Sequence, residues 1–192
     1  MTVKKKLQKE YISTPKGVYK INKNKDVRKM GLKSEKQDKI MELVYENPNK
    51  DFTVREIEKL TRLPKTTIAE YLQEMQKRKL LDKNSVFFRI KKTNYLIEKI
   101  SHIGLVDFLI KELNPSCIIL FGSVRKGEYN KESDIDLFIE TSEKKEINTA
   151  KYEKILKHKI QLFIESDINK VHANLFNNIV NGIKLYGSFK IR

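Results

Sequence analysis

The chain is poor in the residues that cross-link small folds or cross membranes. It has one cysteine, Cys117, and no tryptophan. One cysteine excludes an internal disulfide, which agrees with a reducing compartment, and we interpret Cys117 as a small buried hydrophobic side chain rather than a catalytic thiol. No apolar run approaches the ~18 residues that a membrane span needs, and no signal-peptide type of apolar stretch follows the N-terminus. We therefore expect a soluble, cytoplasmic protein with no membrane partner.

Acidic residues are also scarce relative to basic ones. The chain carries 40 Lys and Arg against 25 Asp and Glu, a net charge of +15. Residues 1–33 hold eleven of the basic residues against only Glu10 and Asp26. Such a basic arm suits a polyanion such as nucleic acid, because Lys and Arg displace counterions from phosphates. A solubilising tail is the alternative interpretation of the same composition.

Residues 34–93 follow the pattern of a winged helix-turn-helix. Apolar residues at helical spacing predict one helix from about Ser34 to the Asn47-Pro48 turn and another from about Lys65, just after Pro64. Between them, Thr53 and Glu56 form a capping-box pattern that opens a short helix. Residues 86–91 alternate apolar and polar side chains, which predicts a strand as the wing.

A DNA-binding function for this unit would use the start of the second long helix and the wing. The candidate residues are Lys65, Thr66, Thr67, Tyr71, Arg89, Lys91 and Lys92. Glu70 and Glu74 on the same helix would repel phosphate, so a protein-docking or dimerisation role stays open beside DNA binding. A connecting helical segment, residues 94–113, follows, with Gly104 as a bend or break.

The residues with the clearest chemistry lie between two apolar strands. Gly122 allows a sharp turn close to a ligand, and Ser123 stands where a helix begins, so that its hydroxyl and the free N–H groups can hold phosphate oxygens. Asp134 and Asp136 are two apart on a strand, so both side chains point to one face. Neighbouring carboxylates repel each other, which favours a hard divalent cation. Arg125 and Lys126 can neutralise a bound triphosphate.

The motif resembles the signature of the DNA polymerase beta superfamily of nucleotidyltransferases, which is Gly-Ser, ten residues, then Asp-x-Asp. Leu120-Phe-Gly-Ser123, Ser133-Asp-Ile-Asp-Leu137 and the closing segment 175–187 are similar to the minimal prokaryotic branch. The resemblance covers residues 114–187. An Asp-x-Asp alone would be weak, because it also occurs where a strand edge merely solvates a turn.

Together with the helical pattern of residues 34–93, the resemblance implies an α+β or α/β chain, in which the winged helix-turn-helix is followed by a small mixed-sheet nucleotidyltransferase domain flanked by helices. The expected divisions are the arm (1–33), the winged unit (34–93), the connecting segment (94–113) and the transferase domain (114–192). The implied site has Asp134 and Asp136 as catalytic and metal-binding residues, and Gly122, Ser123, Arg125 and Lys126 as nucleotide-binding residues.

The same resemblance implies a nucleoside triphosphate substrate, with ATP as the leading candidate, and Mg²⁺ or Mn²⁺ as the metal. The implied reaction is transfer of a nucleoside monophosphate to a protein or nucleic-acid hydroxyl. A small helical partner protein and a homodimer are both compatible with it. The family's third carboxylate is replaced here by Gln161, and Glu165 on the same strand face is an alternative metal ligand. The neutral amide favours a second hypothesis, a DNA-binding or antitoxin-like regulator whose transferase domain senses nucleotide or is degenerate.

Overall fold

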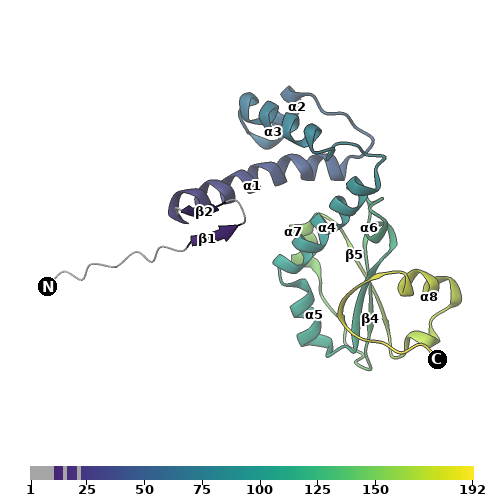
Figure 1. Cartoon of the computed structure of the whole chain (residues 1–192). Coiled ribbons are helices and arrows are strands. Elements are labelled where there is room, and N and C mark those ends of the chain that lie inside the picture. The colour runs from purple at the N-terminus through teal and green to yellow at the C-terminus, as the bar shows by residue number, and fades with distance from the viewer. Residues whose placement is uncertain (1–10, 15–16, 21–22) are drawn as a thin grey trace.

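The structure is a computed structural model that describes residues 11–14, 17–20 and 23–192 (Figure 1). An antiparallel hairpin comes first, β1 (Tyr11–Thr14) and β2 (Gly17–Lys20). The helices that follow are α1 (Lys23–Glu46), α2 (Val54–Thr61), α3 (Lys65–Lys77), α4 (Val86–His102) and α5 (Leu105–Leu113). The remaining elements are β3 (Cys117–Phe121), α6 (Gly122–Lys126), β4 (Ile135–Glu140), α7 (Ala150–Leu156), β5 (Ile160–Glu165), the 3₁₀ turn η1 (Ile168–Lys170), α8 (Ala173–Val180) and β6 (Ile183–Gly187). In the part of the chain that is described, no helix is long and apolar enough to cross a bilayer.

The predicted helices α2 and α3 begin at the capping residues that the sequence indicates. The Thr53 hydroxyl accepts a hydrogen bond from Glu56 N, and the Glu56 carboxylate accepts one from Thr53 N at 2.8 Å. This reciprocal capping box satisfies two backbone donors that the first turn of α2 would otherwise leave free. Pro64 directly precedes α3, where its missing N–H costs nothing.

The predicted wing is wrong, because residues 86–91 are the first turns of α4. The Ser85 hydroxyl caps this helix by accepting a hydrogen bond from Phe88 N at 3.0 Å. Phe88, Lys92, Leu96 and Ile100 are buried at every fourth position, whereas Val86 and Ile90 are 65% and 52% exposed. Within residues 23–192 the first strand after α3 is β3, so a winged helix-turn-helix is not identified.

One predicted boundary changes and another is confirmed. α1 begins at Lys23, so residues 23–33 of the predicted arm are helical and the helix expected from Ser34 is the second half of α1. The predicted break at Gly104 is confirmed, since this residue has a φ of 72° and separates α4 from α5. The rest of the basic arm, apart from the hairpin, lies outside the described residues.

The predicted mixed sheet is confirmed, with strand order β5-β4-β3-β6. β3 pairs antiparallel with β4 and β6, and β4 pairs parallel with β5. Ile118, Leu120 and Leu137 point to the face that α4, α5 and α7 cover, whereas Ile119 and Phe138 point to the face of α8. Figure 1 shows α5 and α7 on one side of the sheet and α8 on the other.

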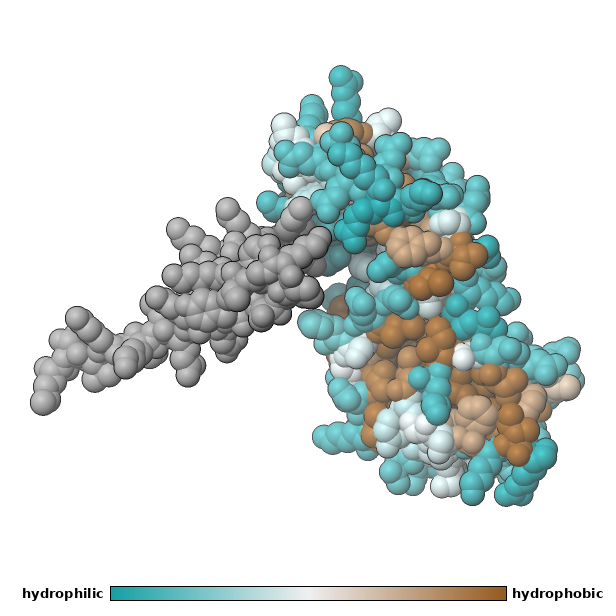
Figure 2. Space-filling view, viewed as in Figure 1, coloured by the Kyte–Doolittle hydropathy of each residue, from teal (hydrophilic) through white to brown (hydrophobic). Residues whose placement is uncertain are grey.

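The N-terminal helices share their core with the sheet. One cluster of buried side chains runs from α1, α2 and α3 through α4 to the inner face of β3 and β4. Tyr45 of α1 packs against Phe88 and Tyr95 of α4, with ring centroids 5.3 and 5.4 Å apart. The surface over α2 and α3 is mainly hydrophilic, whereas apolar residues gather over the sheet and its helices (Figure 2).

Candidate active site

The Gly-Ser motif stands at the junction of β3 and α6, as the sequence predicts. β3 ends at Phe121, and Gly122 turns the chain into α6 with a φ of 69°, a conformation that favours glycine. A Cβ at Gly122 would lie 2.9 Å from Asp136 Cγ and would overlap Asp136 Oδ2. The glycine is therefore required twice, for its backbone conformation and for the close approach of the Asp136 carboxylate.

The antiparallel register of β3 and β4 produces this approach. Phe121 pairs with Asp136, so the last residue of β3 lies beside the second aspartate of the motif. Ile135 and Leu137 are fully buried toward the helical core, which leaves Asp136 half-buried on the opposite face and Asp134 exposed just before the strand. Burial, and then the negative charge of Asp134, raise the pKa of Asp136. A divalent cation between two such carboxylates would relieve their repulsion, so the donor set fits Mg²⁺ or Mn²⁺.

The strand β5 decides what lies beside Asp136. In the parallel register Asp136 pairs with Gln161, and Glu165 pairs with Glu140 at the other end of the strand. Glu165 is therefore roughly 13 Å further along, at the ~3.3 Å rise of a strand residue. Its carboxylate accepts hydrogen bonds from Ser166 N at 2.7 Å and Ser166 Oγ at 3.1 Å. This register removes Glu165 from the predicted metal site.

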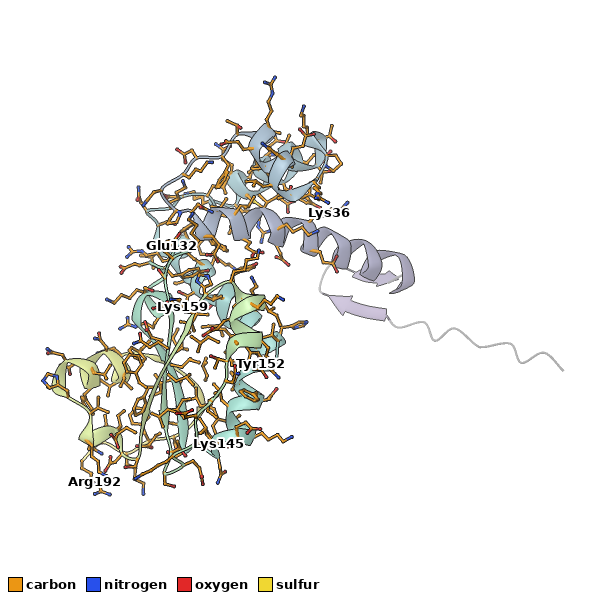
Figure 3. All side chains as sticks on the ribbon, turned by 180° about the vertical axis from the view of Figure 1, so that it is seen from behind. Lys36, Glu132, Lys145, Tyr152, Lys159 and Arg192 are labelled. Atoms are coloured by element: carbon orange, nitrogen blue, oxygen red, sulfur yellow. The ribbon has the colours of Figure 1, made fainter. Side chains whose placement is uncertain are left out.

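Within residues 35–192, the aspartate pair thus has no third carboxylate beside it. Among the described residues, no group of three or more His, Cys, Asp or Glu side chains stands together as a metal site. Glu132 and Lys159, which come shortly before β4 and β5, lie at the end of the sheet below α1, whereas Lys145 and Arg192 lie at the opposite end (Figure 3). The Gly-Ser turn, the aspartates and Gln161 all belong to the end near α1.

The comparison with protein families agrees with this geometry. Residues 104–189 match the family model described as the nucleotidyltransferase domain. This segment carries every residue of the Gly-Ser and Asp-x-Asp motifs, and it begins between α4 and α5. No curated protein and no solved structure matches the chain. The family typically uses divalent metals, in keeping with the carboxylates of Asp134 and Asp136 at the start of β4.

The structure places Arg125 and Lys126 in the last turn of α6, two and three residues after Ser123. The Arg125 side chain is partly buried and that of Lys126 is exposed. Gly127 ends the helix with a φ of 68°, and a Cβ there would lie 2.5 Å from the Arg89 carbonyl oxygen of α4. The end of α6 is thus fixed directly against a helix outside the matched domain.

The predicted DNA-binding residues of α3 are only partly available. Lys65 and Thr66 are exposed and Thr67 is partly exposed, but Lys65 already forms an ion pair with Glu58 at 3.4 Å. Tyr71 is only 7% exposed, in the core formed by the N-terminal helices. Tyr71 is therefore a core residue, which corrects its assignment to a base-contacting surface.

The three basic residues assigned to the wing lie on α4. Arg89 and Lys91 are exposed on this helix, whereas Lys92 is 1% exposed and cannot contact DNA. The Lys92 ammonium donates a hydrogen bond to the Tyr129 carbonyl, and the Tyr129 hydroxyl donates one back to Lys92 O at 3.0 Å. Burial lowers the pKa of Lys92 to about 8. Lys92 thus anchors α4 to the segment between the two motifs, a role that its position in the sequence did not indicate.

The sequence also did not indicate that a buried histidine contacts the residue before Asp134. The His158 side chain is 1% exposed, with Nδ1 2.7 Å from Ser133 O and Nε2 3.1 Å from Glu46 Oε1. The Glu46 carbonyl accepts a hydrogen bond from Lys131 N at 2.9 Å. Burial lowers the pKa of His158, but the Glu46 carboxylate and the Ser133 carbonyl raise it by more, so that the net pKa is raised. The loop that ends at Asp134 is therefore tied to the last turn of α1.

Proposed function

We propose that the chain transfers a nucleoside monophosphate from a nucleoside triphosphate to a hydroxyl group of a protein or nucleic acid. ATP is the leading candidate for the triphosphate. The observation that carries this proposal is the contact of the Asp136 carboxylate with the Gly-Ser turn at Gly122. Such a contact brings a cation-binding pair and a phosphate-binding turn to one end of the sheet. The matched nucleotidyltransferase segment contains both.

Each residue of the site has a distinct task in this reaction. Gly122 and Ser123 leave backbone N–H groups and a hydroxyl free for phosphate oxygens. Arg125 and Lys126 add positive charge where the triphosphate carries negative charge. Asp134 and Asp136 would hold Mg²⁺ or Mn²⁺, which supplies charge neutralisation to the phosphate oxygens when bound.

The transfer itself is an in-line displacement. The acceptor oxygen forms a new bond to the α-phosphorus while the bond from that phosphorus to the bridging oxygen breaks, and pyrophosphate and one proton are released. Gln161 lies beside Asp136 in the sheet, and an amide cannot take up the proton. Catalysis by this chain therefore rests on positioning and electrostatic stabilisation more than on a general base.

Gln161 also supports a second candidate function. A site that holds nucleotide through Gly122, Ser123, Asp134 and Asp136 but lacks a base suits a nucleotide sensor better than a fast enzyme. Joined to a basic N-terminal region, such a sensor would act as a DNA-binding or antitoxin-like regulator. The two functions differ in one observable, which is covalent transfer of the nucleotide.

The deciding experiment incubates the full chain with each α-³²P-labelled nucleoside triphosphate, with Mg²⁺ or Mn²⁺, in the presence of cell extract. Transfer predicts label on a protein or nucleic acid, together with release of pyrophosphate. The double variant Asp134→Asn, Asp136→Asn is the matched control and should give none. If no triphosphate labels any acceptor, while the wild-type chain still binds nucleotide, the nucleotide-sensor function is supported and the transferase function is refuted.

A further inference from the structure

A basic cavity adjoins the Gly-Ser helix on the side of α4. It has a volume of about 440 Å³, and its walls come from α4, the last turn of α6 and the start of β6. Arg89, Arg125 and Lys126 supply its charge, and Val86, Ile90 and Ile183 supply apolar surface. α4 ends at His102, before the matched nucleotidyltransferase segment begins at residue 104. One wall of the cavity is therefore an addition of this chain to the matched domain.

The positive charge of this cavity is largely uncompensated. Within residues 35–192, the side chains of Arg125 and Lys126 form no ion pair. Arg89 Nη1 lies 4.0 Å from Glu128 Oε1, at the outer limit of an ion pair. Three cations around one small cavity, with a single distant carboxylate, create a potential that attracts an anionic ligand.

Exposed apolar side chains stand on the same turns of α4. Val86 and Ile90, which are 65% and 52% exposed, line the cavity. Phe87, which is 46% exposed, lies outside the cavity, with Lys91 Nζ 5.7 Å from its ring centroid. An inorganic anion or an acidic peptide would use the charge but not the ring of Phe87. Single-stranded nucleic acid would use both, because its phosphates follow a basic groove while its bases stack on aromatic rings.

The cavity is also close to the proposed reaction site. Arg125 and Lys126, which we also assign to the triphosphate, share the five-residue helix α6 with Ser123, within roughly 5 Å along its axis at a rise of 1.5 Å per residue. Arg89 of α4 is the cation of the cavity that the triphosphate leaves to the acceptor. Gly122, at the start of the same helix, contacts Asp136. The cavity therefore adjoins the helix whose first residue contacts the aspartate pair.

We propose that this cavity binds the phosphate backbone of a single-stranded nucleic acid, which is the acceptor of the transfer reaction. The role of this nucleic acid as the acceptor rests on the proposed function, but its binding to the cavity requires neither nucleotide nor metal. Among the two acceptor classes that the nucleotidyltransferase site allows, it selects nucleic acid over protein.

The test measures binding of a fluorescent oligouridylate of about 12 nucleotides to the full chain, by anisotropy across a salt series without triphosphate or metal. Arg89→Ala should weaken binding about five-fold and reduce the slope of log K against log salt by about 0.7, the value for one lost phosphate contact with a single strand. Phe87→Ala should weaken binding without changing the slope, because stacking releases no counterions. Alanine is tolerated at both exposed helical positions.

Arg55→Ala is the matched control, since Arg55 is exposed on α2 and has no ion pair among the described residues. It should leave both affinity and slope unchanged. An unchanged Arg89→Ala slope, a slope change in Arg55→Ala instead, or equal competition by oligoglutamate of the same charge would each overturn the proposal. Asp134→Asn with Asp136→Asn should still bind the oligonucleotide, so a failure of the transferase and a failure of the cavity are distinguishable.

Discussion

The strongest test of how the N-terminal helices support the site is replacement of His158. His158→Ala removes the contact to Ser133 O and leaves the Glu46 carboxylate, whose side chain is 14% exposed, without its cationic partner. One lost hydrogen bond costs about 1 kcal/mol, and a carboxylate left unpaired in a partly buried position costs about 1–3 kcal/mol more. The expected loss in the free energy of unfolding is therefore about 2–4 kcal/mol near pH 6.

The size of this loss should depend on pH, and the sign follows from the raised pKa of His158. A histidine whose pKa is higher in the folded state than its unfolded value of about 6.5 stabilises the fold fully below that value. This contribution is lost as the pH rises through the folded pKa. The difference between wild type and His158→Ala should therefore be larger near pH 6 than near pH 9, where only the Nδ1–H bond to Ser133 remains.

Urea unfolding at the two pH values measures both effects. His158→Gln keeps one N–H donor without a titrating group, so its loss should be smaller and independent of pH. His102→Ala is the matched control, because His102 is exposed at the end of α4, and it should cost about 0.5 kcal/mol or less. A His158→Ala loss below about 1 kcal/mol, or one equal at both pH values, would refute the buried ion pair.

Two substitutions probe the site itself. Gly122→Ala places a Cβ against Asp136 and forces a positive φ on alanine, so it should weaken Mg²⁺-dependent nucleotide binding at least about ten-fold in calorimetry, at a cost of about 1–3 kcal/mol in a thermal melt. Unchanged nucleotide affinity would mean that this contact is not part of the site. Gln161→Asp adds a carboxylate beside Asp136, and we expect a faster initial rate of label transfer; a rate no higher than that of wild type would place the missing carboxylate elsewhere.

The sequence predicts the parts of the site that are close together in the chain. Gly122 and Asp136 meet because β3 and β4 are consecutive strands, joined through α6, and their antiparallel register pairs Phe121 with Asp136. The spacing of the motif is enough to specify this arrangement. The capping box of α2 is equally local, and it forms as predicted.

The contributions of α1 and α4 could not be predicted in this way. Residues 86–91 satisfy the alternating pattern of a strand, but six residues are too few to separate it from a helix whose buried positions, Phe88 and Lys92, lie four apart. The sequence alone indicates that Lys92 is a surface cation, because its partner, the Tyr129 carbonyl, comes from a segment 37 residues away. Glu46 and His158 are 112 residues apart, and only the tertiary fold brings them together.

In the proposed function, Asp134 and Asp136 hold a divalent cation opposite a phosphate-binding turn. Calorimetric titration of ATP into the full chain, with and without Mg²⁺, tests this arrangement most directly. We expect binding that requires Mg²⁺ in the wild type and is abolished in Asp134→Asn with Asp136→Asn, with the thermal stability of the chain retained. Nucleotide binding of unchanged affinity in the double variant would contradict it.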